Sequence, residues 1–138
     1  MPFPMPSKPK TFYEMELERV YQKTSFRPEH YLQIRQSKAF MKKYHTERIE
    51  LNDLAAVAFM SKFHYVRTFQ RMYGLTPRHY LRDLRIAKAK TLLRQGISIT
   101  QTCFDVGYES LPTFSTAFKK CTGLTPRAYQ KRHQSNLE

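Results

Sequence analysis

The hydrophobic positions between residues 28 and 132 recur mostly with the period of α-helices. Leu51, Leu54, Ala55 and Ala58 stand at i, i+3, i+4 and i+7, which is typical of one buried helix face. The same periodicity predicts a helix from Pro28 with a buried stripe, and then a series of shorter helices. The stripe would contain Ile34, Ala39, Phe40 and Tyr44. The later helices would cover about residues 49–60, 62–73, 77–95, a short stretch after Ser98, a stretch after Ser110, and 126–132.

The start of the chain follows a different pattern. Residues 1–10 contain four prolines, and this composition predicts a disordered segment. Residues 11–22 mix three glutamates with aromatic and aliphatic residues. Helical spacing and strict alternation compete there, so both structures stay open. We find no convincing strand pattern after residue 22.

Small residues mark where the predicted helices begin and end. Ser61 and Ser110 are suitable N-caps, and glycines at 74 and 123 can adopt the left-handed conformation that ends a helix. Each glycine is followed by Leu-Thr-Pro, in which threonine can cap the next helix and proline can take its first position. Ser98 with Gln101 predicts a capping box.

A block in the middle of the chain recurs near its end. Residues 74–78 read Gly-Leu-Thr-Pro-Arg, and residues 123–127 repeat them after 49 positions. Phe69 returns as Phe118 at the same spacing, whereas before Ser61 the offset falls to 48 because Glu109 is an extra residue. A repeat of this size in a basic chain indicates a pair of similar binding modules more readily than an enzyme.

Each repeat predicts a short helix, a tight turn and a second helix, which is helix-turn-helix geometry. The second helix must pack one face on the first helix and keep the other for a partner. In the first repeat the outward residues would be Lys62, Phe63, Val66, Arg67, Gln70 and Arg71. In the second repeat they would be Leu111, Thr113, Ser115, Thr116, Lys119 and Lys120.

The charge of the chain points to a polyanionic partner. Its 24 Lys and Arg residues against 11 Asp and Glu give a formal net charge of +13. An anionic membrane surface is the weaker reading, because the sequence has no long apolar run and no signal peptide is visible. The histidines and the two cysteines have no metal-type spacing. We therefore expect no catalytic residue, metal or cofactor, and buried, reduced thiols at Cys103 and Cys121.

The sequence resembles the AraC/XylS family of bacterial transcription regulators over about residues 32–132. In the first repeat the matching residues are Leu51, Leu54, Ala55, Ser61, Arg67, Phe69 and Gly74, followed by Arg85, Ile86, Ala89, Leu92 and Leu93. In the second they are Ile99, Val106, Gly107, Tyr108, Ser110, Phe114, Phe118, Lys119, Lys120, Gly123, Thr125, Pro126 and Tyr129.

The resemblance implies an all-α fold of about seven helices, with two helix-turn-helix subdomains joined by a long central helix. The expected parts are an N-terminal extension over 1–28, a first subdomain over 29–76, a linking helix over 77–95, a second subdomain over 96–132 and a tail over 133–138. The linking helix would be roughly 28 Å long and could set two recognition helices about one turn of DNA apart, ~34 Å.

The resemblance also implies a function. One chain would read two successive major-groove segments of double-stranded promoter DNA, and contact with RNA polymerase would make it an activator. Its place would be the cytoplasm, on the nucleoid. No small-molecule effector is evident in this chain. Arg67 suits guanine, whereas Lys119 and Lys120 better suit phosphates. We therefore expect the first repeat to dominate base reading.

Other functions stay open beside this one. The chain could be the DNA-binding domain of a longer effector-responsive regulator, a non-specific architectural binder, or part of an enzyme that acts on DNA. Three residues depart from the family pattern. Phe59 stands where glycine is frequent and leaves open a different turn, Thr102 takes a usually aliphatic core position, and Pro112 removes a backbone donor near the start of its helix. Arg85 would form a structural ion pair rather than contact DNA.

Overall fold

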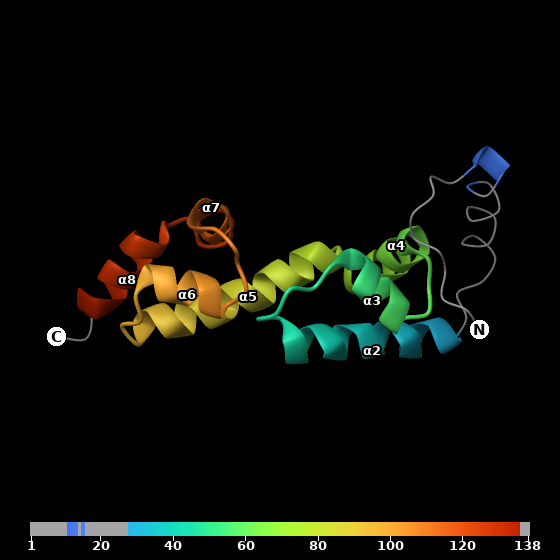
Figure 1. The fold of residues 1–138 in the computed structure, drawn as a ribbon, viewed down its shortest axis with the longest axis horizontal. Coiled ribbons are helices and arrows are strands. Elements are labelled where there is room, and N and C mark those ends of the chain that lie inside the picture. The colour runs from blue at the N-terminus through green and yellow to red at the C-terminus, as the bar shows by residue number, and fades with distance from the viewer. Residues whose placement is uncertain (1–10, 14, 16–27, 136–138) are drawn as a thin grey trace. The chain divides into compact units, whose positions relative to one another are not determined.

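The computed structural model describes residues 11–13, 15 and 28–135. All regular secondary structure within residues 28–135 is helical (Figure 1). The helices are α2 (Pro28–Tyr44), α3 (Leu51–Val57), α4 (Lys62–Tyr73), α5 (Pro77–Arg94), α6 (Ile99–Asp105), α7 (Leu111–Thr122) and α8 (Pro126–Ser135). The all-α prediction with about seven helices is confirmed. The disorder expected for residues 1–10, and most of the open choice for 11–22, lie outside the described residues.

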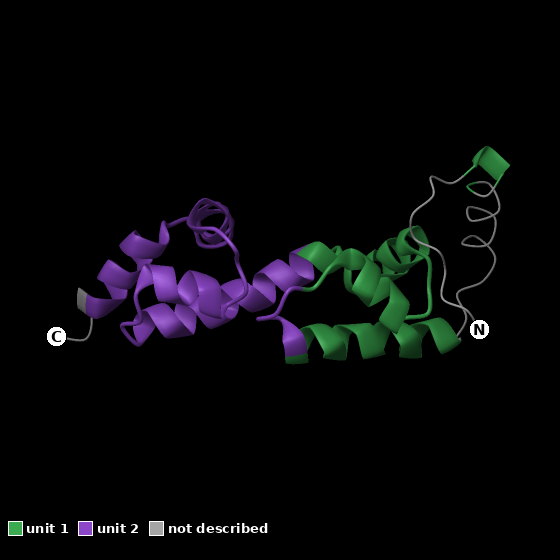
Figure 2. Ribbon diagram, in the orientation of Figure 1, with its two compact units in different colours: residues 1–43, 49–78 green, residues 44–48, 79–138 purple. Residues whose placement is uncertain are grey.

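The chain forms two compact units, drawn in different colours in Figure 2. Unit 1 comprises residues 1–43 and 49–78, and unit 2 comprises residues 44–48 and 79–138. The chain therefore passes from one unit to the other after residues 43, 48 and 78. The expected linking helix is α5, and its first two residues fall in unit 1 while the remainder falls in unit 2.

Helix boundaries follow the predicted capping residues. Ser61, Ser98 and Ser110 each accept a hydrogen bond from the backbone N–H three residues later, at 3.2, 3.1 and 3.4 Å. Gly74 and Gly123 end α4 and α7 with φ of 77° and 81°. The capping box expected at Ser98 is incomplete, because the Gln101 side chain donates to Asp105 at 2.7 Å instead.

Three elements differ from their predicted form. α3 is shorter than expected, because residues 58–60 already belong to the turn that follows it. α8 continues to Ser135 rather than fading at residue 132. In α2 the prediction for Ala39 is wrong: Ala39 is exposed, and the residues that α2 buries fully are Ile34, Ser37 and Met41.

The turn between α3 and α4 has the same form as the turn between α6 and α7, although Phe59 stands where the second turn has Gly107. Phe59 and Gly107 both have positive φ, 55° and 100°. In both turns the N–H of this residue bonds to the carbonyl three residues back, and the next N–H bonds to the carbonyl five residues back. The alternative of a different turn is therefore wrong. A left-handed phenylalanine costs about 1–2 kcal/mol relative to glycine.

Each unit has an aromatic core. In unit 1 Tyr65 and Phe69 of α4 are fully buried together with Ile34, Met41 and Ala58. In unit 2 the buried cluster consists of Ile86, Ala89, Leu93, Cys103, Val106, Phe114, Phe118 and Tyr129. Gln130 of α8 donates to the carbonyls of Leu93 and Ile97 at 3.1 and 2.7 Å, which satisfies one acceptor in the last turn of α5 and one in the loop that follows it.

Substitution of Gly107 by alanine should destabilise the protein more than the same substitution of Gly123. A Cβ at Gly107 would lie 2.9 Å from the carbonyl oxygen of Thr46, whereas a Cβ at Gly123 meets nothing within 4 Å. Both variants to alanine carry the cost of a positive φ, about 1–2 kcal/mol. We expect Gly107→Ala to lose a further ~1–3 kcal/mol through the clash. Urea unfolding of the two variants measures the difference, and equal losses would contradict the close approach.

Replacing Thr102 by valine should stabilise the protein. Thr102 is fully buried, and its Oγ1 has no hydrogen-bond partner among the described residues. Thr102→Val removes that uncompensated polar atom at nearly constant volume, so we expect a gain of about 1 kcal/mol in the free energy of unfolding. Thr122→Val is the matched control, because Thr122 Oγ1 donates to the carbonyl of Phe118 at 2.8 Å and accepts from Leu124 N at 3.1 Å. The control should lose stability in the same thermal unfolding experiment.

Candidate nucleic-acid interface

The rotation of α4 about its axis is fixed by its buried face. Tyr65 and Phe69 are four residues apart, and their rings lie 5.9 Å from each other. The Tyr65 hydroxyl donates to Ser37 Oγ at 2.9 Å, and Ser37 donates in turn to the carbonyl of Ile34 at 2.7 Å. Burial raises the pKa of Tyr65 well above its ordinary value, although the bond to Ser37 partly opposes the shift. The phenol therefore stays neutral and anchors α4 on α2.

This anchoring turns the predicted residues of α4 outward. The exposed ones are Lys62, Phe63, Arg67, Gln70 and Arg71. Val66 is half-buried. Side chains spaced three and four residues apart share one side of a helix, so the six gather on one face of unit 1. The face combines three cations, an amide and two apolar groups, which are the side chains that read base edges in a major groove.

α7 repeats this arrangement in unit 2. Phe114 and Phe118 are fully buried with ring centroids 5.8 Å apart. On the other side Leu111, Thr113, Thr116, Lys119 and Lys120 are exposed, and Ser115 is half-buried. The Thr113 hydroxyl accepts a hydrogen bond from Ser110 Oγ at 2.8 Å. It is therefore already part of the N-cap, which leaves α7 with fewer groups for base reading than α4.

The first turns of α4 and α7 contain no acidic residue, and their last turns are basic. A helix N-terminus carries a partial positive charge, so both starts are suited to phosphate. Pro112 is the second residue of α7 and lacks an N–H, so that start offers one donor fewer.

Arg85 of α5 has a structural role, as expected, but through different partners. Its Nε donates to the carbonyl of His45 at 2.7 Å, and its guanidinium donates to the carbonyl of Glu47 at 2.8 Å. The guanidinium also lies 5.6 Å from the centre of the Tyr108 ring. The expected ion pair is therefore wrong: two backbone carbonyls take the place of a carboxylate. All these residues belong to unit 2, and the contacts bind segment 44–48 to it.

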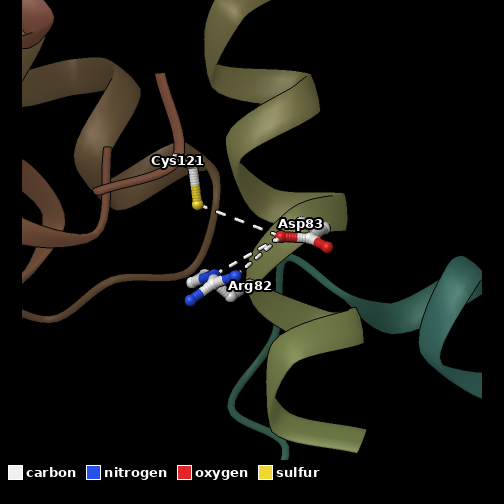
Figure 3. Close-up of polar contacts among 3 residues, drawn as sticks. All are labelled: Arg82, Asp83 and Cys121. Carbon is white, nitrogen blue, oxygen red and sulfur yellow. Dashed lines mark hydrogen bonds and ion pairs between the residues drawn. The ribbon is translucent and has the colours of Figure 1, made fainter. Parts of the chain in front are cut away.

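The two cysteines differ in their surroundings. Cys103 is buried as predicted, and burial raises the pKa of its thiol. The prediction for Cys121 is wrong, because Cys121 is exposed. Figure 3 shows its sulfur directed toward Asp83 of α5, 3.9 Å from Oδ1, and Arg82 Nη2 lies 3.3 Å from the same oxygen. Cys121 is the second-last residue of α7 and does not belong to the buried cluster of unit 2.

No group of three or more His, Cys, Asp or Glu residues in the described part of the chain could hold a metal ion. No helix within the same residues is long and apolar enough to cross a membrane.

A further group of cations lies on α2, outside the site residues that the sequence predicts. These cations are Arg35, Lys38 and Lys42, with Lys43 beside them, and none belongs to the predicted recognition faces. Arg35, Lys38 and Lys42 are spaced at i, i+3 and i+7 in α2. This spacing places them on one side of a helix and was the available signal.

Comparison with known proteins places these features in a family. A protein-family model described as a helix-turn-helix domain matches residues 54–132. The chain is 37% identical over 95 residues to the MmsAB operon regulatory protein of Pseudomonas aeruginosa, covering 68% of this chain and 31% of that protein. It is 34% identical over 100 residues to the bifunctional transcriptional activator/DNA repair enzyme AdaA of Bacillus subtilis, covering 72% and 46%. The chain thus spans less than half the length of either relative.

Solved structures agree with the fold. A transcriptional regulator from Chromobacterium violaceum, described as containing an AraC-type DNA-binding domain, matches with a TM-score of 0.65 and 26% identity, covering 73% of this chain and 91% of that one. The DNA-binding domain of AdpA, a global transcriptional factor crystallised with a target DNA, matches with a TM-score of 0.71 and 24% identity, covering 75% and 94%. Together with the two capped and exposed second helices, these matches show that the chain belongs to the AraC/XylS family of helix-turn-helix regulators.

Proposed function

We propose that this protein regulates transcription by binding promoter DNA in a sequence-specific way, with α4 and α7 as the two recognition helices. The observation that carries the proposal is the repeated two-faced helix. In both units the second helix buries an aromatic pair and leaves a polar, cationic face exposed. The similarity to an AraC-type regulator and to a DNA-binding domain solved with its target supports the same assignment.

The two faces would contribute unequally. Arg67 is exposed near the middle of α4 and can donate two hydrogen bonds to guanine, while Phe63 and Val66 can contact thymine methyl groups. The face of α7 offers hydroxyls, one of them engaged in the N-cap, and Lys119 and Lys120 close to its end. We assign base reading mainly to α4, and affinity and placement mainly to α7.

The broader setting follows from the relatives. AdaA is described as a transcriptional activator, so we propose activation, with RNA polymerase as the protein partner. Because bacterial promoters lie in the cytoplasm, we also propose that the protein acts there, on the nucleoid. AdaA is also described as a DNA repair enzyme, but this chain spans only 46% of AdaA, and the helix-turn-helix model accounts for residues 54–132. We therefore propose no catalytic activity for this chain.

The stoichiometry of binding tests the proposal directly. One chain contains two unequal reading faces, so selection from a random duplex library should yield an asymmetric site. Sedimentation of the purified complex should give one 16.5 kDa chain per site. A palindromic site that is filled only by two chains would sink the single-chain reading. Equal affinity for selected and random duplexes would point to an architectural binder instead.

The roles of the two helices can be separated by substitution. Arg67→Ala should cost ~1–3 kcal/mol on the selected site and relax the preference at one base pair. Lys120→Ala should weaken binding to selected and random duplexes about equally, and should lower the salt slope by roughly one unit. Fluorescence anisotropy titrations at several salt concentrations measure both effects. A loss that Arg67→Ala shows equally on random DNA would argue against base reading.

A further inference from the structure

Unit 1 contains a basic hollow in addition to the outward face of α4. The hollow has a volume of about 340 Å³ and is lined by Arg35, Lys38, Ala39 and Lys42 of α2 and by Tyr73 of α4. Arg35 and Lys42 are exposed, Lys38 is half-buried, and the small Ala39 side chain leaves room among them. Among the residues that the structure describes, the lining thus has three cations and no carboxylate. Such a surface favours an anion.

Tyr73 gives the hollow a fixed wall. Its ring packs edge-on against the fully buried Phe69, with centroids 4.9 Å apart. Lys38 Nζ lies 4.2 Å from the centre of the Tyr73 ring, a cation–π contact. The positive charge of Arg35 acts on the Tyr73 phenol, where it partly opposes the rise in pKa that burial causes. Because one of the three cations is already held in place, less side-chain freedom is lost when an anion binds.

The position of Tyr73 places the hollow beside the outward face of α4. Seven residues of an α-helix turn through almost two full circles, so Tyr73 lies only about 20° from Val66 around the axis. It lies about 60° from Gln70 by the same geometry. Tyr73 is therefore at the edge of the face that carries the proposed reading residues. When a helix lies in a major groove, the edges of its reading face are next to the phosphates that border the groove.

We propose that this hollow binds a backbone phosphate of the DNA duplex that α4 reads. The inference rests on the proposed function, and extends the interface from the second helix of the repeat to α2. A free anion fits less well, because exposed ion pairs contribute little on their own. A phosphate held in the duplex is delivered at high effective concentration by the contacts of α4, so three partly exposed cations suffice.

The test compares neighbouring lysines on α2. Lys42→Gln removes a lining cation without touching the Lys38–Tyr73 contact, and Lys38→Gln with Lys42→Gln removes two. Lys43→Gln is the matched control, because Lys43 is an exposed cation on the same helix that does not line the hollow. Thermal unfolding establishes that all three variants are folded. Binding is then measured on selected and random duplexes between 50 and 200 mM salt.

We expect the double variant to lose about one unit of salt slope, so that its affinity falls roughly fourfold less than that of the parent over this range. Lys42→Gln should also lower the salt slope, and Lys43→Gln should leave it unchanged. Ethylation of backbone phosphates should reveal one phosphate, bordering the segment read by α4, that matters for the parent and not for the double variant.

Equal slopes for the double variant and the Lys43 control would overturn the inference. So would calorimetry in which pyrophosphate binds the parent at micromolar concentration and is lost in the double variant, while the DNA salt slope stays unchanged; the hollow would then be a site for a free phosphorylated ligand. A parent that binds selected and random duplexes equally would refute the proposed specific function. The slope and ethylation comparison still decides the role of the hollow in that case.

Discussion

The burial of two aromatic rings, four residues apart, governs what each unit can present to a partner. Tyr65 and Phe69 in α4, and Phe114 and Phe118 in α7, are all fully buried. A helix anchored at i and i+4 cannot rotate about its axis without exposing a ring, at a cost of about 1.5–3 kcal/mol for each side chain. The outward residues are therefore fixed by the inward ones. The polar face therefore keeps its orientation without any interaction of its own.

The two units share this design and differ in how their tight turns are stabilised. In unit 2 the glycine at the turn lets the backbone approach Thr46, and Arg85 binds the carbonyls on either side of that residue. In unit 1 the corresponding position is Phe59, which adopts the left-handed conformation in spite of its side chain and is 55% exposed. Unit 1 therefore stores strain in its turn, and its neighbouring hydrogen bonds must hold the strained residue in place.

Local chemistry is why so much of the fold could be predicted. Serine caps, left-handed glycines and proline at a first helical position act within a few residues, and the helices begin and end there. The exposed faces of α4 and α7 followed from the same periodicity. Contacts between distant residues could not be predicted in this way. The carbonyl partners of Arg85 are about 40 positions away, and an exposed carbonyl has no distinctive signature in a sequence.

The predictions that were wrong also failed because they depend on contacts between distant residues. Ala39 satisfies the helical period, but Ser37 is buried in its place because its hydroxyl can bond both to its own helix and to Tyr65. Cys121 continues the apolar spacing of α7 but does not belong to the buried cluster of unit 2. The basic hollow needs a tyrosine from another helix to complete it. Periodicity identifies a face of a helix, but it does not identify which side chains of other helices pack against that face.

The interleaving of segment 44–48 with unit 2 limits how this protein can be dissected. Neither compact unit is a continuous stretch of chain. A fragment that begins at residue 79 would retain Arg85 and Gly107 but would lack segment 44–48, whose carbonyls Arg85 binds and whose Thr46 carbonyl leaves no room for a Cβ at Gly107. A fragment that ends at residue 78 would keep a loop whose partners have been removed. The repeated sequence suggests two interchangeable modules, yet no single cut in the chain yields two intact ones, and a graft of the second module would have to bring the loop with it.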